Sequence, residues 1–264
     1  MSKLFNEFSV VSLAAWKDKI QTDLKGADYK KKLISQAEGI EIDAVYHEDN
    51  SPQNNPINST KEWDIYQLID GSDATKANQS ALQALANGAT ALCIDNPTDL
   101  KILFQNVLIE HIRVDFKNYN ASIPQEFESL ILERGINTQE IKGAFHGEEN
   151  GVLPNFYYRS ILGNGETAQQ QIANALSKGK EENGNKQFVF EIGSNYFLEI
   201  AKLRAFRILW NEKVGENPYI FAQTTLNNKE EEFAYNNLLR TTTEGMSAIF
   251  GGCDGLLIHP YNKS

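Results

Sequence analysis

The sequence predicts an α/β fold, a (β/α)8 barrel of the TIM type that follows an N-terminal arm. Three observations predict it. The chain has 264 residues with 41% hydrophobic side chains, enough for one large core. After residue 61, short apolar runs alternate with amphipathic segments, which is the rhythm of a parallel sheet with crossover helices. Eight such runs occur, the number that closes a barrel; the competing doubly wound sheet usually needs fewer strands.

The expected strands are short runs rich in apolar residues. They span 63–69, 91–95, 112–116, 141–145, 156–162, 188–192, 219–223 and 255–259. Helices are expected between them at 74–86, 100–109, 124–134, 167–178, 196–210 and 231–250. The link between 145 and 156 lacks a clear helical pattern. Few residues follow the eighth strand, so the last barrel helix is expected to be truncated.

The first sixty residues have a different pattern and are expected to form an arm and linker. Residues 9–24 carry apolar side chains at roughly helical spacing, and Gly26 follows as a stop. Residues 39–46 alternate with period two, which indicates a strand and hairpin. Residues 48–60 are rich in Asn, Ser and Pro, as a linker is. The expected division is therefore an arm and linker at 1–60 and a barrel at 61–264.

Composition excludes several classes of function. Lys and Arg number 25 against 35 Asp and Glu, and a net charge of −10 opposes binding to nucleic acid. No run of about 18 apolar residues could cross a membrane, and the first residues do not resemble a secretory signal. Cys93 and Cys253 suit a reduced, cytoplasmic chain. The four histidines lack the spacing of zinc ligands, so no metal site is expected.

Three polar residues lie at the carboxyl ends of expected strands, where barrel enzymes keep their catalytic groups. Asp95 could be such a carboxylate, but the Asp-Asn-Pro sequence also suits an ordinary turn. His146 and His259 could act as general acid or base near neutral pH, or they could be hydrogen-bonded structural groups. No nucleophile and base can be paired from spacing alone.

Two further features have alternative interpretations. Residues 163–168 read G-x-G-x-x-A after a strand and before a helix, which could bind phosphate or could be a capped turn. Arg159 and Glu191 each interrupt an apolar strand. They could form a buried ion pair across neighbouring strands, or one or both could face the edge of the helix layer.

Longer blocks resemble the methylmalonyl-CoA mutase family. The helical block NYFLEIAKLRAFRILW resembles the helix after that family's sixth strand, and AQTT is similar to its C-Q-T-S. YNNLLRT, FGG and WDIYQ are similar to its Y-N-N-x-x-R-T, F-G-G and W-x-I-R-Q segments. The resemblance runs from about Trp16 to His259. It implies a (β/α)8 barrel that binds acyl-CoA, with adenosylcobalamin held by a separate C-terminal domain.

Departures from that family lie at its functional positions. The alignment places Leu162 where active members have the histidine that contacts the substrate thioester. Tyr219 stands at the CoA-contacting arginine, and Tyr66 at the arginine of W-x-I-R-Q. The closing CDGLLIHPY and the opening DLKGADY look like the small, non-catalytic subunit of the heterodimeric mutase. No histidine lies in the D-x-H-x-x-G context of a cobalamin domain.

The resemblance therefore implies a chain without catalytic residues or a bound cofactor. It would be the partner of a homologous catalytic large subunit, and the complex would isomerise methylmalonyl-CoA and succinyl-CoA with adenosylcobalamin. Remnants of the acyl-CoA site would be Gln223, Asn237, Arg240 and Tyr219. The alternative is a free-standing acyl-CoA-binding barrel, or a barrel enzyme with a remodelled site at Asp95, His146 and His259.

Overall fold

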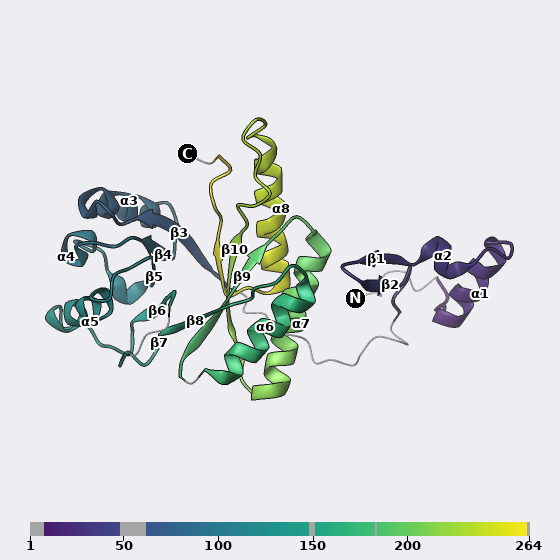
Figure 1. Ribbon diagram of the computed structural model, residues 1–264, viewed down its shortest axis with the longest axis horizontal. Helices are drawn as coiled ribbons and strands as arrows, with labels where there is room; N and C mark the ends of the chain where they lie inside the picture. The colour runs from purple at the N-terminus through teal and green to yellow at the C-terminus, as the bar shows by residue number, and fades with distance from the viewer. Residues whose placement is uncertain (1–7, 48–61, 148–150, 183, 263–264) are drawn as a thin grey trace. The chain divides into compact units, whose positions relative to one another are not determined.

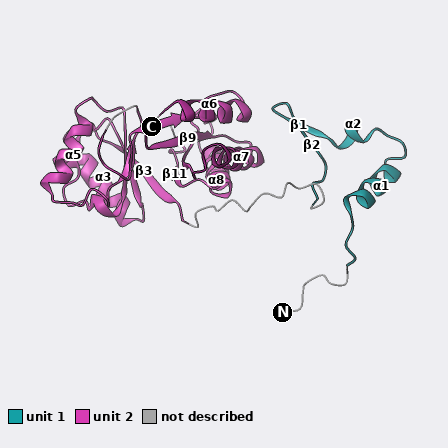
Figure 2. Cartoon of the chain, turned by 90° about the horizontal axis from the view of Figure 1, so that it is seen from below, with its two compact units in different colours: residues 1–56 teal, residues 57–264 magenta. Residues whose placement is uncertain are grey.

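The computed structural model describes residues 8–47, 62–147, 151–182 and 184–262. The chain divides into two compact units, Met1–Pro56 and Ile57–Ser264, which Figure 2 colours separately. Within the described residues, no helix is both long enough and apolar enough to cross a bilayer.

The first unit contains two short helices and a hairpin. Helix α1 (Leu13–Asp23) is capped by Ser12, whose side chain accepts a hydrogen bond from the backbone N–H of Ala15. Helix α2 (Tyr29–Leu33) is capped by Asp28. The sequence pattern did not predict α2. Strands β1 (Ser35–Ala37) and β2 (Ile40–Ile42) pair antiparallel and form a hairpin. Strand β2 is shorter than the strand predicted at residues 39–46. None of the described residues of this unit is buried. Residues 8–47 therefore form no buried apolar core among themselves.

The second unit contains one parallel sheet whose strand order is β7-β6-β5-β4-β3-β11-β10-β9-β8. Its strands are β3 (Asp64–Asp70), β4 (Ala91–Asp95), β5 (Arg113–Lys117), β6 (Lys142–Phe145), β7 (Phe156–Tyr157), β8 (Arg159–Leu162), β9 (Lys186–Ile192), β10 (Tyr219–Thr224) and β11 (Gly255–Leu257). The first and last strands of this order, β7 and β8, are separated in the chain by Tyr158 alone. The sheet therefore closes on itself, and the barrel prediction is confirmed over the doubly wound alternative.

The fifth barrel strand is divided into β7 and β8 by a local irregularity. Tyr157 faces the interior, where its ring lies 5.5 Å from that of Tyr219, and Ser160 also faces inward because its Oγ accepts from Gln187 Nε2. Regular alternation would put residues 157 and 160 on opposite faces. An extra residue in the strand, as in a β-bulge, accounts for both the shared face and the broken ladder.

The helices follow the expected positions with changes at their ends. They are α3 (Ala74–Ala86), α4 (Leu100–Leu103), α5 (Ile123–Glu133), α6 (Ala168–Glu181), α7 (Tyr196–Val214) and α8 (Asn236–Gly251). Helix α4 is much shorter than predicted; Asn106 adopts a left-handed φ of 63° and a 3₁₀ turn follows at Ile109–His111. Helix α7 continues past its expected end to Gly215, a left-handed cap. The described residues after β11 contain no helix.

The apolar core between strands and helices lies in two halves of the barrel. Figure 1 shows α3, α4 and α5 beside one half of the sheet and α6, α7 and α8 beside the other. Apolar side chains fill the space between strands and helices, with Phe116 and Phe127 in one half and Phe188 and Phe206 in the other. Close strand packing also needs Gly143, which has a φ of 152° and where a Cβ would lie 1.9 Å from the Val114 carbonyl oxygen.

The hypothesis of an Arg159–Glu191 pair is wrong. The register pairs Arg159 with Lys186 at the start of β9, and Glu191 lies five residues further along that strand. At about 3.3 Å per residue, this separation is roughly 16 Å along the barrel. Arg159 instead forms an ion pair of 3.0 Å with Glu182. Sequence alternation did not reveal that the two residues lie toward opposite ends of the barrel.

Candidate functional site in the barrel interior

The interior of the barrel is occupied by a buried arginine. Arg113, 6% exposed, projects from β5, and its Nε donates to the Tyr66 hydroxyl at 2.8 Å. Its guanidinium lies 3.9 Å from the centre of the Tyr219 ring and 5.2 Å from that of Tyr157. A further donation reaches the Gly143 carbonyl at 3.3 Å. Aromatic faces and hydroxyls thus surround a cation that would be costly to bury alone.

Asp115, two residues further along β5, connects this cluster to the carboxyl end of the barrel. Its side chain is fully buried and accepts from the Tyr66 hydroxyl at 2.9 Å and from Gln187 Nε2 at 3.1 Å. His146 Nε2, just past β6, lies 2.8 Å from Asp115 Oδ2, the oxygen that Gln187 also contacts, whereas Tyr66 binds Oδ1. Gln187 Nε2 also reaches Ser160 Oγ at 3.0 Å. One carboxylate therefore joins groups from β3, β5, β6 and β9.

Charge within this cluster is set by burial and by neighbouring groups. Burial alone would raise the pKa of Asp115, but the hydrogen bond with His146, the charge of Arg113 and the hydrogen bond from Gln187 outweigh it and hold that pKa below its ordinary value. Burial lowers the pKa of His146, with Lys117 and Arg113 adding to the effect against the attraction of Asp115. At neutral pH the pair is thus a carboxylate and a neutral imidazole, and the imidazole donates its Nε2–H to the carboxylate.

The carboxyl mouth of the barrel contains a second set of polar contacts. Lys117 Nζ donates to Gln223 Oε1 at 2.7 Å and lies 5.4 Å from the centre of the Phe221 ring. Gln223 Nε2 in turn lies 3.4 Å from a Glu191 carboxylate oxygen. Asp95, at the end of β4, accepts from Asn118 Nδ2 at 2.7 Å. The predicted residues Gln223 and Asp95 are therefore engaged by the protein itself.

His259 lies just past β11, and its backbone N–H donates to Thr224 Oγ1 at 2.9 Å. Burial, together with the charges of Lys117 and Lys229, lowers the pKa of its imidazole to about 4. A neutral ring is therefore the stable form in the folded chain down to acid pH.

This shift predicts a loss of stability on acidification. Between pH 6.5 and pH 4 the unfolded chain binds a proton at His259 that the folded chain excludes, so the free energy of unfolding falls as pH falls. After allowance for solvent near the ring, the cost is about 1 to 2 kcal/mol. Urea unfolding of the chain and of His259→Gln at pH 7 and pH 4.5 measures it. The free energy of unfolding should fall less in His259→Gln than in the unchanged chain between pH 7 and pH 4.5. Equal falls would contradict the lowered pKa of His259.

The four residues expected to be remnants of an acyl-CoA site are not gathered in one place. The Tyr219 hydroxyl donates to Asp64 at 2.8 Å at the amino end of the barrel, whereas Gln223 lies at the opposite end of the same strand. Asn237 and Arg240, on α8, contact each other at 2.8 Å and both bind Glu230. The last two residues thus fix the loop before α8.

Leu162, which the resemblance places at the histidine of active members, presents no polar group. Leu162 ends β8 opposite Val189, which faces the interior, and it is 43% exposed. A leucine side chain can neither donate a hydrogen bond nor move a proton.

The G-x-G-x-x-A segment is a capped turn in this structure. Thr167 and Gln170 form a capping box at the start of α6, and Gln170 Oε1 accepts from the backbone N–H groups of Glu166 and Thr167. The donors that a phosphate would use are therefore already engaged.

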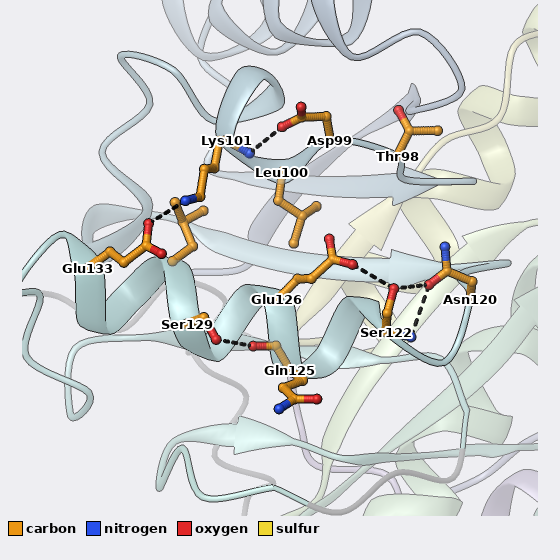
Figure 3. Close-up of a pocket in the computed structure, with 11 residues that line it drawn as sticks. Thr98, Asp99, Leu100, Lys101, Asn120, Ser122, Gln125, Glu126, Ser129 and Glu133 are labelled. Atoms are coloured by element: carbon orange, nitrogen blue, oxygen red, sulfur yellow. Dashed lines mark hydrogen bonds and ion pairs between the residues drawn. The ribbon is translucent and has the colours of Figure 1, made fainter.

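A groove outside the barrel contains none of the predicted site residues. It measures about 830 Å³ and lies between the start of α4 and α5 (Figure 3). Lys101 and Glu133 pair across it at 2.7 Å, and Ser122 donates to Glu126 at 2.6 Å. Its polar side chains largely satisfy one another.

Sequence reasoning missed Arg113, Asp115, Lys117 and Gln187. The first three occupy alternate positions of the run RVDFK, so they share one face of a strand. The signal for a polar cluster was a strand inside the barrel sequence that carries charges on one face and apolar residues on the other. Gln187 had no comparable signal.

Throughout the described part of the chain, no group of three His, Cys, Asp or Glu side chains is arranged to hold a metal ion.

Comparisons with known proteins point to one family. The model of the methylmalonyl-CoA mutase family matches residues 165–264. A methylmalonyl-CoA mutase small subunit from Porphyromonas gingivalis is 28% identical over 98% of this chain and 54% of that protein. Methylmalonyl-CoA mutase from Rhizobium meliloti is 26% identical over 67% of the chain and 33% of that protein. The chain thus spans about half the length of the small subunit and a third of the longer enzyme.

Solved structures add little. A dihydropteroate synthetase superposes with a TM-score of 0.42 at 11% identity, covering 86% of this chain and 91% of that one, which is too distant to bear on function. The two sequence comparisons together confirm the resemblance of this chain to the methylmalonyl-CoA mutase family and, over 98% of its length, to a small subunit of that enzyme.

Proposed function

We propose that this chain is the non-catalytic partner of a homologous large subunit, in a complex that isomerises methylmalonyl-CoA and succinyl-CoA with adenosylcobalamin. The observation that carries the proposal is the filled interior. Tyr66 and Tyr219, at two positions where active members have arginine, have hydroxyls 3.4 Å apart and share Arg113. Side chains of the protein thus use the interior that an acyl-CoA-binding barrel would need for its ligand.

Loss of directed donors supports the same conclusion. A thioester carbonyl must be held by groups that strengthen their contact in the transition state, and removing one such donor commonly costs about 10²–10³ in rate. Leu162 provides no donor, and the Tyr219 hydroxyl is committed to Asp64. Several such losses together predict no measurable isomerisation by the chain alone.

The first unit supports a role in assembly. Its described residues include none that is buried, and short helices and a two-stranded hairpin are marginal alone in water. Leu13, Trp16 and Ile20 lie on one side of α1 by helical spacing. We propose that residues 1–60 act as an arm that packs on the large subunit in the cytoplasm. A permanent interface of this kind should bury more than about 2,000 Å².

The test combines turnover with assembly. The purified chain with adenosylcobalamin is expected to give no succinyl-CoA from methylmalonyl-CoA, whereas co-expression with a large subunit should yield a 1:1 complex. Trp16→Asp with Ile20→Asp should abolish co-purification, and Lys19→Ala, on the polar side of α1, should not. Cobalamin-dependent turnover by this chain alone would overturn the proposal.

A second candidate is an acyl-CoA-binding barrel or barrel enzyme with a remodelled site. The His146–Asp115 contact of 2.8 Å favours it, because a neutral imidazole oriented by a carboxylate is a competent general base. This alternative predicts that the chain alone binds acyl-CoA, measured by calorimetric titration, and that His146→Ala changes the binding. The first proposal predicts no binding in either protein.

A further inference from the structure

An apolar stripe runs along the outward side of α8. Four large uncharged side chains recur there at helical spacing and are between 43% and 78% exposed; they are Tyr235, Leu239, Met246 and Phe250. The opposite side of the helix faces the sheet, where Ala248 is completely buried. The helices of a barrel form one outer ring, so a neighbour such as α7 covers the flank of α8 and not its outward side (Figure 2). We call these four residues, with the two threonines between them, the α8 stripe.

The middle of the α8 stripe is apolar although its residues are threonines. Thr242 and Thr243 lie between Leu239 and Met246 and are exposed. Their hydroxyls donate to the carbonyls of Leu238 and Leu239 at 2.6 and 3.1 Å. A threonine whose hydroxyl is bonded to its own helix leaves its methyl group as the free end. The stripe therefore has small apolar groups at its centre and large ones toward both ends, and an exposed patch of this kind marks an interaction surface.

Opposite charges lie at the two ends of the α8 stripe. At the C-terminal end, Arg204 of α7 donates from Nε and Nη2 to the Phe250 carbonyl at 3.1 and 2.8 Å. Arg204 is exposed, and the other N–H groups of its guanidinium remain for a further acceptor. At the N-terminal end, Glu231 and Glu232 are exposed in the turn that leads into α8. The stripe thus has a cation at one end and carboxylates at the other.

We propose that the α8 stripe is the contact surface for a second copy of this chain, related by a two-fold axis that passes between Thr242 and Thr243. Such an axis sets the two copies of α8 antiparallel. Leu239 then meets the partner's Met246, and Tyr235 meets the partner's Phe250, because both pairs are centred on the same point of the helix. The threonines at the crossing allow the two helix axes to approach to about 8–10 Å.

Charge selects this antiparallel arrangement. It brings Arg204 of each copy toward Glu231 and Glu232 of the other, so the opposite charges meet twice in the dimer. A parallel arrangement would bring like charges together at both ends and would align the two helix dipoles. An uncharged partner would leave both ends without a counter-charge. A second copy is therefore the occupant that the charges of the stripe favour.

The contact is expected to be weak. A single pair of helices buries less than the standard interface of about 1,600 Å². Each chain also carries a net charge of −10, which opposes self-association. We expect a dissociation constant of about 10–100 μM.

Sedimentation equilibrium of the full chain tests the contact. Over a concentration range of about 5 to 300 μM, the mean mass should rise from 29.7 kDa toward twice that value. Leu239→Glu with Met246→Glu sets carboxylates opposite each other and should lower the association constant by at least about tenfold. Leu132→Glu on α5 changes an equally exposed leucine, 71% exposed, and should associate as the unchanged chain does. Thermal unfolding checks that each variant is folded.

An exchange of charges tests the arrangement itself. Arg204→Glu in one chain, and Glu231→Lys with Glu232→Lys in another, should each weaken association at least about tenfold, since each homodimer then sets like charges together. An equimolar mixture of the two variants should associate as well as the unchanged chain, because both ends regain opposite charges. Mixing cannot restore the bond that Arg204→Glu loses at the Phe250 carbonyl. Recovery in the mixture therefore reports the contact between copies.

Three results would overturn the proposal. The first is an unchanged chain that stays monomeric at the highest concentration, and the second is association that Leu239→Glu with Met246→Glu does not weaken. The third is a mixture that associates no better than its two components. A monomeric chain whose binding to a large subunit is lost in Leu239→Glu with Met246→Glu would assign the α8 stripe to that subunit instead. None of these measurements involves turnover, so their outcome is independent of the proposed non-catalytic role.

Discussion

Arg113→Met is expected to lower the free energy of unfolding of the barrel by about 3 to 5 kcal/mol, because it removes a buried cation that lies 3.7 Å from Asp64 and whose charge helps to keep the fully buried Asp115 ionised. Asp115 would retain its contacts with Tyr66 and Gln187, but the charge that helps to keep it ionised would be gone. The stacking of the guanidinium on Tyr219 would also be lost. Urea unfolding followed by tryptophan fluorescence measures the change.

Two further variants separate charge from shape. Arg113→Lys retains the positive charge but not the planar guanidinium. Its free energy of unfolding should therefore lie between those of the wild type and Arg113→Met. Arg113→Met with Asp115→Asn removes both charges and should recover part of the loss, since a neutral amide costs less to bury. A loss below about 1 kcal/mol for Arg113→Met alone would mean that the cluster does not depend on its cation.

Asp254→Ala is expected to cost a similar amount, about 3 to 5 kcal/mol, at the amino end of the barrel. Arg207 of α7 is 4% exposed and donates to Asp254 at 2.7 Å and to the Gly252 and Pro218 carbonyls at 2.6 and 2.9 Å. Asp254 also accepts from the Ile220 N–H at 2.7 Å. Its removal would leave a buried guanidinium short of a counter-charge and a buried donor without its acceptor.

The matched control is an exposed pair of the same length. Lys101 and Glu133, drawn in Figure 3, also lie 2.7 Å apart, but their side chains are 68% and 54% exposed. Glu133→Ala should therefore cost less than about 1 kcal/mol. A second control, Asp254→Ala with Arg207→Met, should recover part of the loss. Equal costs for Asp254→Ala and Glu133→Ala would show that burial does not decide the strength of these pairs.

Local patterns in the sequence determined where most elements lie. Helix α3 occupies its predicted bounds, and α6 begins at a capping box that was present as Thr167 and Gln170. These features depend on neighbours within one turn, so spacing and residue type suffice. The alternation of strand and helix likewise predicted the barrel, because parallel strands need crossovers of this length.

Tertiary structure decided which side chains meet inside the barrel. Tyr66 and Arg113 are 47 residues apart in the chain, and Tyr66 and Tyr219 are 153 apart, yet their polar groups lie within 3.4 Å. Alternation tells which face of a strand a residue occupies, but not which layer of the barrel it reaches. That depends on the register of parallel strands, which is fixed by packing across the whole sheet. The same register put Arg159 and Glu191 at different levels and brought His146 to Asp115.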